Sequence, residues 1–107
     1  MTMIIGAQSP EELEFLLEDS LLLGDLQLLT RLFSDEAVLV IGEEIAKGLW
    51  DIANLALVTW KGDNPYIADL RRVIQVQDLA LIFSKQGVNI MRLSYDGSWK
   101  YIVLYRS

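Results

Sequence analysis

The chain has 107 residues and a formal net charge of −6, and it contains neither cysteine nor histidine. A chain of this length buries a single core without disulfide or metal staples, so we expect one domain over residues 1–107. The missing residue types exclude thiol nucleophiles, Ser-His-Asp triads and metal sites built on Cys or His. The glycines form no phosphate-binding motif and the acids no calcium-loop spacing, so we expect no metal and no cofactor.

The composition is apolar for a soluble chain, with 52% hydrophobic residues and a mean hydropathy of +0.31. No apolar run reaches the 18 or so residues that span a bilayer, and the start, Met1 to Ile5, lacks the basic segment of a signal peptide. We therefore expect a cytoplasmic protein without a membrane role. The acidic balance disfavours nucleic acid, whose phosphates attract Lys and Arg. Surplus apolar surface of this kind is typical of a ligand cavity or a subunit interface.

The first half of the chain has helical periodicity. Ser9-Pro10-Glu11-Glu12 is a strong helix start, because serine caps the first turn and proline fits the first helical position. Leucines at helical spacing follow as far as Gly24-Asp25, which is expected to end this helix and cap a second one. The inner side of the second helix would carry Leu26, Leu29, Leu32 and Phe33.

A short strand is predicted over residues 37–41, ended by Gly42. A third helix is predicted from Glu43 and Glu44, whose charges suit the positive end of a helix dipole. Residues 57–60 either prolong this helix or form an irregular exit. Lys61-Gly62-Asp63-Asn64-Pro65 is a loop.

From Tyr66 onward the sequence predicts an antiparallel meander, with strands over residues 73–76, 79–83, 88–95 and 99–105. Asp96-Gly97 is the strongest hairpin signal. In the last strand, simple alternation places Trp99, Tyr101, Val103 and Tyr105 on one face and Ile102 and Leu104 on the other. Helices first and strands last predict an α+β fold, with the N-terminal helices packed on a curved antiparallel sheet.

The order of these elements resembles the NTF2-like superfamily, or cystatin-like α+β cone, in its SnoaL-like and DUF4440-type branch. The resemblance extends from Ser9 to Arg106 and depends on the order and spacing of five segments: Gly24-Asp25, residues 29–38, residues 42–48, residues 77–80 and residues 96–103. It implies a cone whose curved sheet wraps the first helix and leaves a pocket at the wide end. Members of the superfamily include isomerases, cyclases, dehydratases, pocketed proteins without a known reaction, and association domains, so the fold does not choose an activity.

The resemblance also argues against catalysis. Ketosteroid isomerases of the superfamily place a tyrosine on the first helix and a general-base aspartate on the first strand, and the matching positions here are Leu17 and Ile41. Neither side chain can move a proton. We therefore identify no catalytic residue, and these departures weigh against an enzyme but leave an enzyme as an alternative.

The aromatic residues are better candidates for binding. Tyr and Trp combine a large apolar ring with a polar end, and they are frequent in pockets and interfaces. The cone that the resemblance implies is expected to have a pocket lined by Tyr101, Val103 and Tyr105 on one face of the last strand, with Leu17, Phe33 and Ile41 as apolar wall and Trp50 as a further aromatic residue.

The favoured hypothesis is a non-catalytic protein that binds a hydrophobic small molecule in an apolar pocket and forms a homodimer through the outer face of its sheet. Two alternatives stay open at this point. One is an isomerase-like or cyclase-like enzyme on a hydrophobic small molecule, which would use tyrosines and a carboxylate not located in the sequence. The other is a purely structural association domain whose aromatic residues fill the cone.

Overall fold

The first helix begins and ends where the sequence predicts, whereas the second begins as predicted but ends at Arg31, before the predicted Leu32 and Phe33. In a computed structural model that describes residues 6–107, the Ser9 hydroxyl accepts a hydrogen bond from the Glu12 amide (3.0 Å) and opens α1, Pro10–Leu23. Gly24 ends it with a φ of 67°, a left-handed conformation that glycine adopts without strain. The Asp25 carboxylate accepts from the Leu28 amide (3.1 Å) and caps α2, Leu26–Arg31. The prediction about Met1 to Ile5 lies outside the described residues.

The third helix begins later than predicted. Glu44–Lys47 is a short strand, β2, that pairs antiparallel with β1, Phe33–Ile41. Gly42 makes the tight turn between them with a φ of 60°, and α3, Leu49–Thr59, begins only after Gly48. The prediction of a helix from Glu43 was wrong because a four-residue strand is too short to show its period. Trp60 closes the last turn of α3, since its amide donates to the Ala56 carbonyl.

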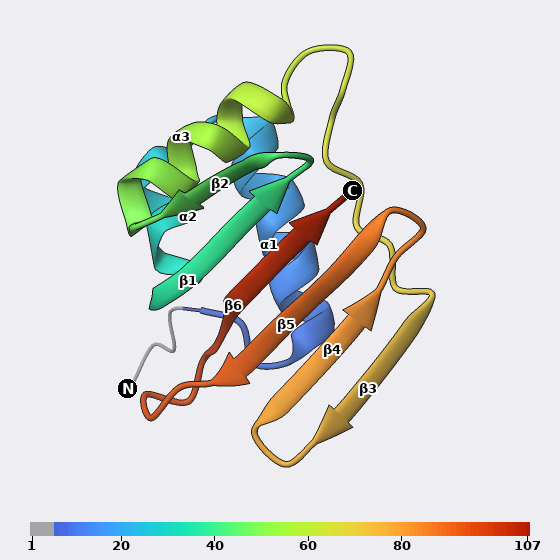
Figure 1. Ribbon diagram of the computed structural model, residues 1–107. Helices are drawn as coiled ribbons and strands as arrows, with labels where there is room; N and C mark the ends of the chain where they lie inside the picture. Colours follow the sequence, from blue (N-terminus) through green and yellow to red (C-terminus); the bar gives the residue numbers. More distant parts are fainter. Residues whose placement is uncertain (1–5) are drawn as a thin grey trace.

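The second half forms the predicted meander. It consists of β3, Arg72–Val76, β4, Leu79–Phe83, β5, Gly87–Leu93, and β6, Trp99–Arg106. All strands join one six-stranded sheet of order β2-β1-β6-β5-β4-β3 (Figure 1). Neighbours run antiparallel except β1 and β6, which run parallel, so the sheet is mixed rather than purely antiparallel.

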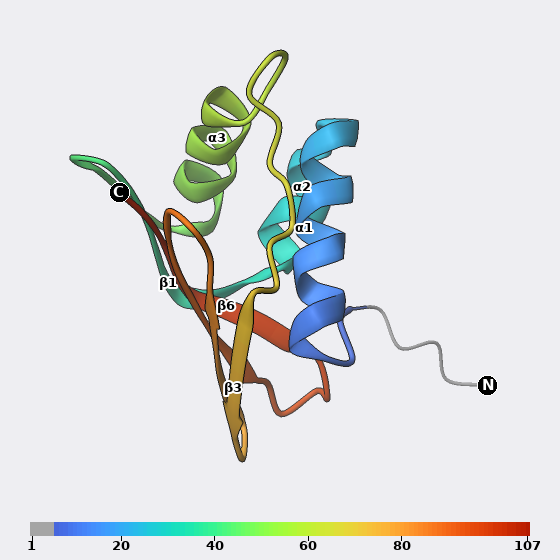
Figure 2. The same cartoon turned by 90° about the vertical axis from the view of Figure 1, so that its right-hand side faces the viewer.

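The three helices of the described chain lie on one side of the sheet, and the other side is left uncovered by them (Figure 2). The sheet is curved and open, and α1 crosses its inner side. Between α3 and β3 the chain runs through residues 60–71 as an irregular segment, which passes between the sheet and α1. These features confirm the α+β cone. None of the helices in residues 6–107 is long and apolar enough to cross a membrane.

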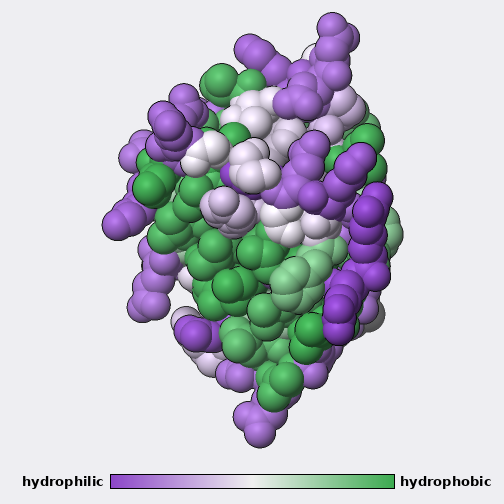
Figure 3. Space-filling view, turned by 45° about the vertical axis from the view of Figure 1, so that its right-hand side comes forward, coloured by the Kyte–Doolittle hydropathy of each residue, from purple (hydrophilic) through white to green (hydrophobic). Residues whose placement is uncertain are grey.

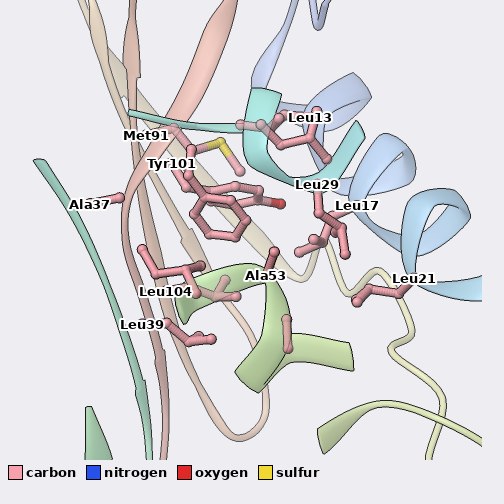
Figure 4. Close-up of a cluster of buried hydrophobic side chains, with 14 of the residues drawn as sticks. Leu13, Leu17, Leu21, Leu29, Ala37, Leu39, Ala53, Met91, Tyr101 and Leu104 are labelled. Carbon is pink, nitrogen blue, oxygen red and sulfur yellow. The ribbon is translucent and has the colours of Figure 1, made fainter. Parts of the chain in front are cut away.

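The last strand departs from simple alternation. β5 pairs Met91 with Tyr101 but Ile90 with Val103, so Ile102 is an extra residue that forms a β-bulge. After the bulge the side chains change faces, and both Tyr101 and Leu104 point into the core (Figure 4). The prediction that Tyr105 shares the face of Tyr101 was therefore wrong. Tyr105 lies on the outer face, 41% exposed.

Leucines of α1 and α2 meet the inner side of the sheet in a common core (Figure 4). Leu13, Leu17 and Leu29 are fully buried, as are Leu39 on β1 and Met91 on β5. Because the side chains of this core fill the centre of the cone, any ligand space lies toward its rim.

Candidate functional site

A buried carboxylate lies among these core residues. Glu14 belongs to the inner stripe of α1, one residue after Leu13 and three before Leu17, and only 1% of it is exposed. Its two carboxylate oxygens accept from the Tyr66 hydroxyl at 2.8 and 3.0 Å. One of them also accepts from the Asn89 side-chain amide at 2.6 Å, and from the hydroxyl of Tyr101. The buried charge is thus well supplied with hydrogen-bond donors, as burial requires.

Arg106 supplies the positive charge around this carboxylate. Its guanidinium donates to the Asn89 carbonyl oxygen at 2.8 Å and to the Tyr66 hydroxyl at 2.9 Å. It also lies 5.4 Å from the centre of the Tyr66 ring, in reach of a cation–π contact. We refer to Glu14, Tyr66, Asn89, Tyr101 and Arg106 as the Glu14 network. It joins α1, the irregular segment, β5 and β6.

The electrostatics of the network follow from its burial. Desolvation raises the pKa of Glu14 above 4.5, and the hydrogen bond from Tyr101 is the largest effect that opposes this rise. Burial and the neighbouring carboxylate both raise the pKa of Tyr66 and of Tyr101. The two phenols therefore stay protonated and act as donors at neutral pH.

An apolar groove opens beside this network. It has a volume of about 610 Å³ and lies between the C-terminal end of α1, the end of α3 and the irregular segment. Leu22, Leu23 and Ile67 on its walls are 81%, 74% and 71% exposed. We call it the apolar groove, and its walls consist of Glu18, Leu21, Leu22, Leu23, Gly24, Leu57, Trp60, Lys61, Gly62, Pro65, Tyr66 and Ile67.

A second hollow, of about 250 Å³, lies on the sheet side of the irregular segment. Its walls are mainly polar and include Arg106, Asp69 and Lys85. We call it the polar hollow. It shares four wall residues with the apolar groove, namely Trp60, Pro65, Tyr66 and Ile67, so the irregular segment forms the partition between the two spaces.

The predicted pocket residues are distributed differently from expectation. Leu17, Phe33 and Tyr101 are in the core, Ile41 and Val103 are half-buried, and Trp50 is 55% exposed. Tyr101 joins the Glu14 network, whereas none of the seven predicted residues lines the apolar groove or the polar hollow. Their contact with a ligand stays a prediction.

Sequence reasoning missed four members of the network. Glu14 had a usable signal, because it lies three residues before Leu17 and seven before Leu21, on the predicted inner stripe. A charged residue at such a position is either paired or functional. Tyr66, Asn89 and Arg106 had no comparable signal, since their positions relative to Glu14 are set only by the folded chain. In residues 6–107 no acidic cluster is arranged to hold a metal ion.

Comparison with known proteins identifies the fold. No family model matches the chain, and no curated protein matches it. Among solved structures, it is similar to a ketosteroid isomerase-like protein from Erwinia carotovora atroseptica, at a TM-score of 0.70, 20% identity and 89% coverage of each chain. It is also similar to a protein of unknown function with a cystatin-like fold from Nostoc punctiforme, at a TM-score of 0.62, 19% identity and coverage of 89% and 84%.

A third similar structure is a proposed dehydratase from the NTF2-like family of Streptomyces avermitilis. Its TM-score is 0.66 at 15% identity, and the match covers 87% of this chain and 88% of that one. Three such matches over most of each chain establish that this protein has the NTF2-like, cystatin-like fold. At these identities the likeness concerns the fold and carries no activity with it.

Proposed function

We propose that the protein binds a small molecule with an apolar body in the apolar groove. The observation that carries the proposal is the groove itself, whose volume of about 610 Å³ falls in the range of ligand sites, roughly 300–1,000 Å³. Its walls hold exposed leucines and Ile67 that nothing in residues 6–107 covers. A ligand that removes this surface from water gains about 25 cal/mol for each Å² of apolar area.

The surroundings of Glu14 favour binding over catalysis. A general base must come within hydrogen-bond reach of the proton that it removes. Glu14 is 1% exposed, and its oxygens accept from Tyr66, Tyr101 and Asn89. The Tyr66 side chain separates it from both hollows, because Tyr66 lines them and Glu14 lines neither. A binding protein needs no group beyond those already in the groove.

We propose further that two copies of the chain associate through the outer face of the sheet. The strand register places two apolar rows side by side on that face, and hydrophobic side chains gather there in Figure 3. One row consists of Ile74, Leu81, Ile90, Val103 and Val38, and the other of Phe83, Val88, Tyr105, Val40 and Ile45. A face of this kind packs well against its own copy in a two-fold dimer.

The charges on the outer face of the sheet also favour a second copy of this chain as the partner. The two rows continue into Lys47 and Arg72 at the edge strands and contain no acidic residue, although the whole chain carries a net charge of −6. The two rows themselves therefore bring no carboxylate into the interface, and Asp35 and Glu36 line a separate hollow together with Arg92 and Lys100.

The groove is tested by titration with the neutral, apolar fluorescent dye Nile red. Ile67→Arg places a charge in the groove, whereas Val58→Arg makes the same change at a similarly exposed site, 66% against 71%, that belongs neither to the groove nor to the two apolar rows. We expect Ile67→Arg to weaken dye binding about tenfold or more and Val58→Arg to leave it within about twofold. Equal effects of the two variants would contradict the proposal.

The dimer is tested by sedimentation at micromolar concentration. The unaltered chain is expected to sediment as a dimer, and Tyr105→Arg, a change in the middle of the outer face, as a monomer of 12.1 kDa. A monomeric unaltered chain would contradict this part. A dimer without any dye binding would instead favour an association domain.

A further inference from the structure

Tyr66 is held in the core mainly by its side chain. It belongs to the irregular segment, yet only 5% of it is exposed. The segment is tied down on either side of it, where Asn64 donates to the Thr59 carbonyl (2.8 Å) and the Ala68 amide donates to Glu18 (2.7 Å). Among the described hydrogen bonds, those of Tyr66 itself all involve its hydroxyl.

The surroundings of this side chain have the parts of a binding site for a phenol. The ring packs edge-on against Trp60, with 5.0 Å between ring centres and an interplanar angle of 81°, and the Arg106 guanidinium lies over it. The hydroxyl donates to Glu14 and accepts from Arg106 at 2.9 Å and from the Asn89 amide at 3.2 Å. Ring and hydroxyl are therefore recognised separately.

We propose that Tyr66 is an internal occupant of this site, and that a ligand carrying an aryl hydroxyl displaces it and bonds Glu14, Asn89 and Arg106 in its place. This inference rests on the proposed function, since the apolar remainder of the ligand occupies the apolar groove. It adds the chemical class of the ligand and the polar end of its site.

The apolar groove and the polar hollow lie on either side of the Tyr66 side chain, so a ligand can take its place from either space. Tyr66 is part of the wall between the apolar groove and the polar hollow, and both spaces also touch Trp60, Pro65 and Ile67. Once the Tyr66 side chain leaves, the two spaces join into one that reaches the Glu14 carboxylate. The incoming hydroxyl replaces the hydrogen bonds that Tyr66 gives up, so the exchange leaves no buried polar group unpaired.

Charge selects a neutral hydroxyl over an acid. The ligand oxygen would lie between the Arg106 guanidinium, which attracts an anion, and the buried Glu14 carboxylate, which repels a carboxylate or a phenolate and accepts only from a hydroxyl that keeps its proton. Burial and then the Glu14 carboxylate raise the pKa of Tyr66, and both effects are larger than the opposing effect of Arg106, so a phenol in its place also keeps its proton. A hydroxyl donates that proton to Glu14, whereas a methyl group or a halogen leaves the carboxylate without this donor.

The test compares p-cresol, which reproduces the tyrosine side chain, with toluene, which lacks only its hydroxyl. Binding is measured by isothermal titration to the unaltered chain, to Tyr66→Ala and to Tyr95→Ala, a fully exposed tyrosine that serves as the matched control. The unaltered chain and Tyr95→Ala are expected to bind p-cresol at least about tenfold more tightly than toluene, since a site built to bond a hydroxyl rejects its analogue. Tyr66→Ala is expected to bind p-cresol still more tightly, because the internal competitor is gone.

Tyr66→Phe keeps the ring and serves if Tyr66→Ala does not fold. It loses the hydrogen bonds that hold the side chain, so p-cresol affinity is again expected to rise above that of the unaltered chain. Equal affinity for p-cresol and toluene, or p-cresol binding to Tyr66→Ala but not to the unaltered chain, would overturn the inference. If either result is found but Ile67→Arg still weakens dye binding, only the inference about Tyr66 fails and the proposed function stands. If the dye does not bind either, the inference and the proposed function are both overturned.

Discussion

Replacing Tyr101 by phenylalanine removes one donor to the buried Glu14 carboxylate and little else. Tyr101 is fully buried and its ring lies 5.2 Å from that of Phe33, so phenylalanine keeps the packing and leaves no sizeable cavity. The lost interaction is the hydrogen bond from its hydroxyl to Glu14. The variant therefore measures how strongly the Glu14 network stabilises the fold.

The expected magnitude follows from the charge of the acceptor. A hydrogen bond to a charged group contributes about 1.5–3 kcal/mol, against about 1 kcal/mol for a neutral pair. For a domain of this size, 1 kcal/mol lowers the Tm by about 4–8 °C, so we expect a fall of about 10 °C at neutral pH. Because this bond lowers the pKa of Glu14, its loss costs less at acidic pH, where Glu14 carries a proton in the folded state.

The assay is unfolding by urea, from neutral pH down to the ordinary glutamate pKa of 4.5. Tyr105→Phe is the matched control on the same strand, because its side chain is 41% exposed and lies on the opposite face. It is expected to change the free energy of unfolding by less than about 0.5 kcal/mol. A Tyr101→Phe variant as stable as this control, or one whose destabilisation grows as the pH falls, would show that the Tyr101 hydroxyl does not stabilise a charged Glu14.

Three further changes test the pH dependence, the core and a helix cap. The raised pKa of Glu14 means that the folded chain holds this proton more tightly than the unfolded chain does. The unaltered chain is therefore expected to lose stability as the pH rises from 4.5 through the raised value, a contribution that Glu14→Gln lacks. Parallel stability–pH curves for the two proteins would contradict this expectation. Leu17→Ala is expected to lower the free energy of unfolding by about 2–5 kcal/mol, whereas the same change at Leu22, which is 81% exposed, is expected to lower it by less than about 0.5 kcal/mol; both are measured by chemical denaturation. Ser9→Ala, which removes the cap of α1, is expected to cost about 0.5–2 kcal/mol, and an unchanged Tm would show that the cap contributes nothing.

The parts of the fold that were predicted correctly have local causes. Ser9 and Gly24 bound α1 through contacts within a few residues, and the α+β order follows from the change of periodicity along the chain. The errors have causes that a local pattern does not contain. β2 forms because Glu44–Lys47 pairs with β1, and the face of β6 changes because Ile102 bulges where that strand pairs with β5.

The site was predicted less well for the same reason. Glu14 and Tyr101 are 87 residues apart in the sequence, and Glu14 and Tyr66 are 52 apart, so their contact depends on the assembled cone. The position of Glu14 on the inner stripe of α1 was accessible from spacing alone. Glu14 lies one helical turn before Leu17, the position that matches the isomerase tyrosine, so the resemblance to isomerases gives no indication of a carboxylate here.

The most direct test of the proposed binding function is a crystal structure of the chain grown with Nile red. We expect dye density in the apolar groove, in contact with Leu57, Trp60 and Ile67. Density confined to the outer face of the sheet, or a groove filled by its own side chains, would contradict it.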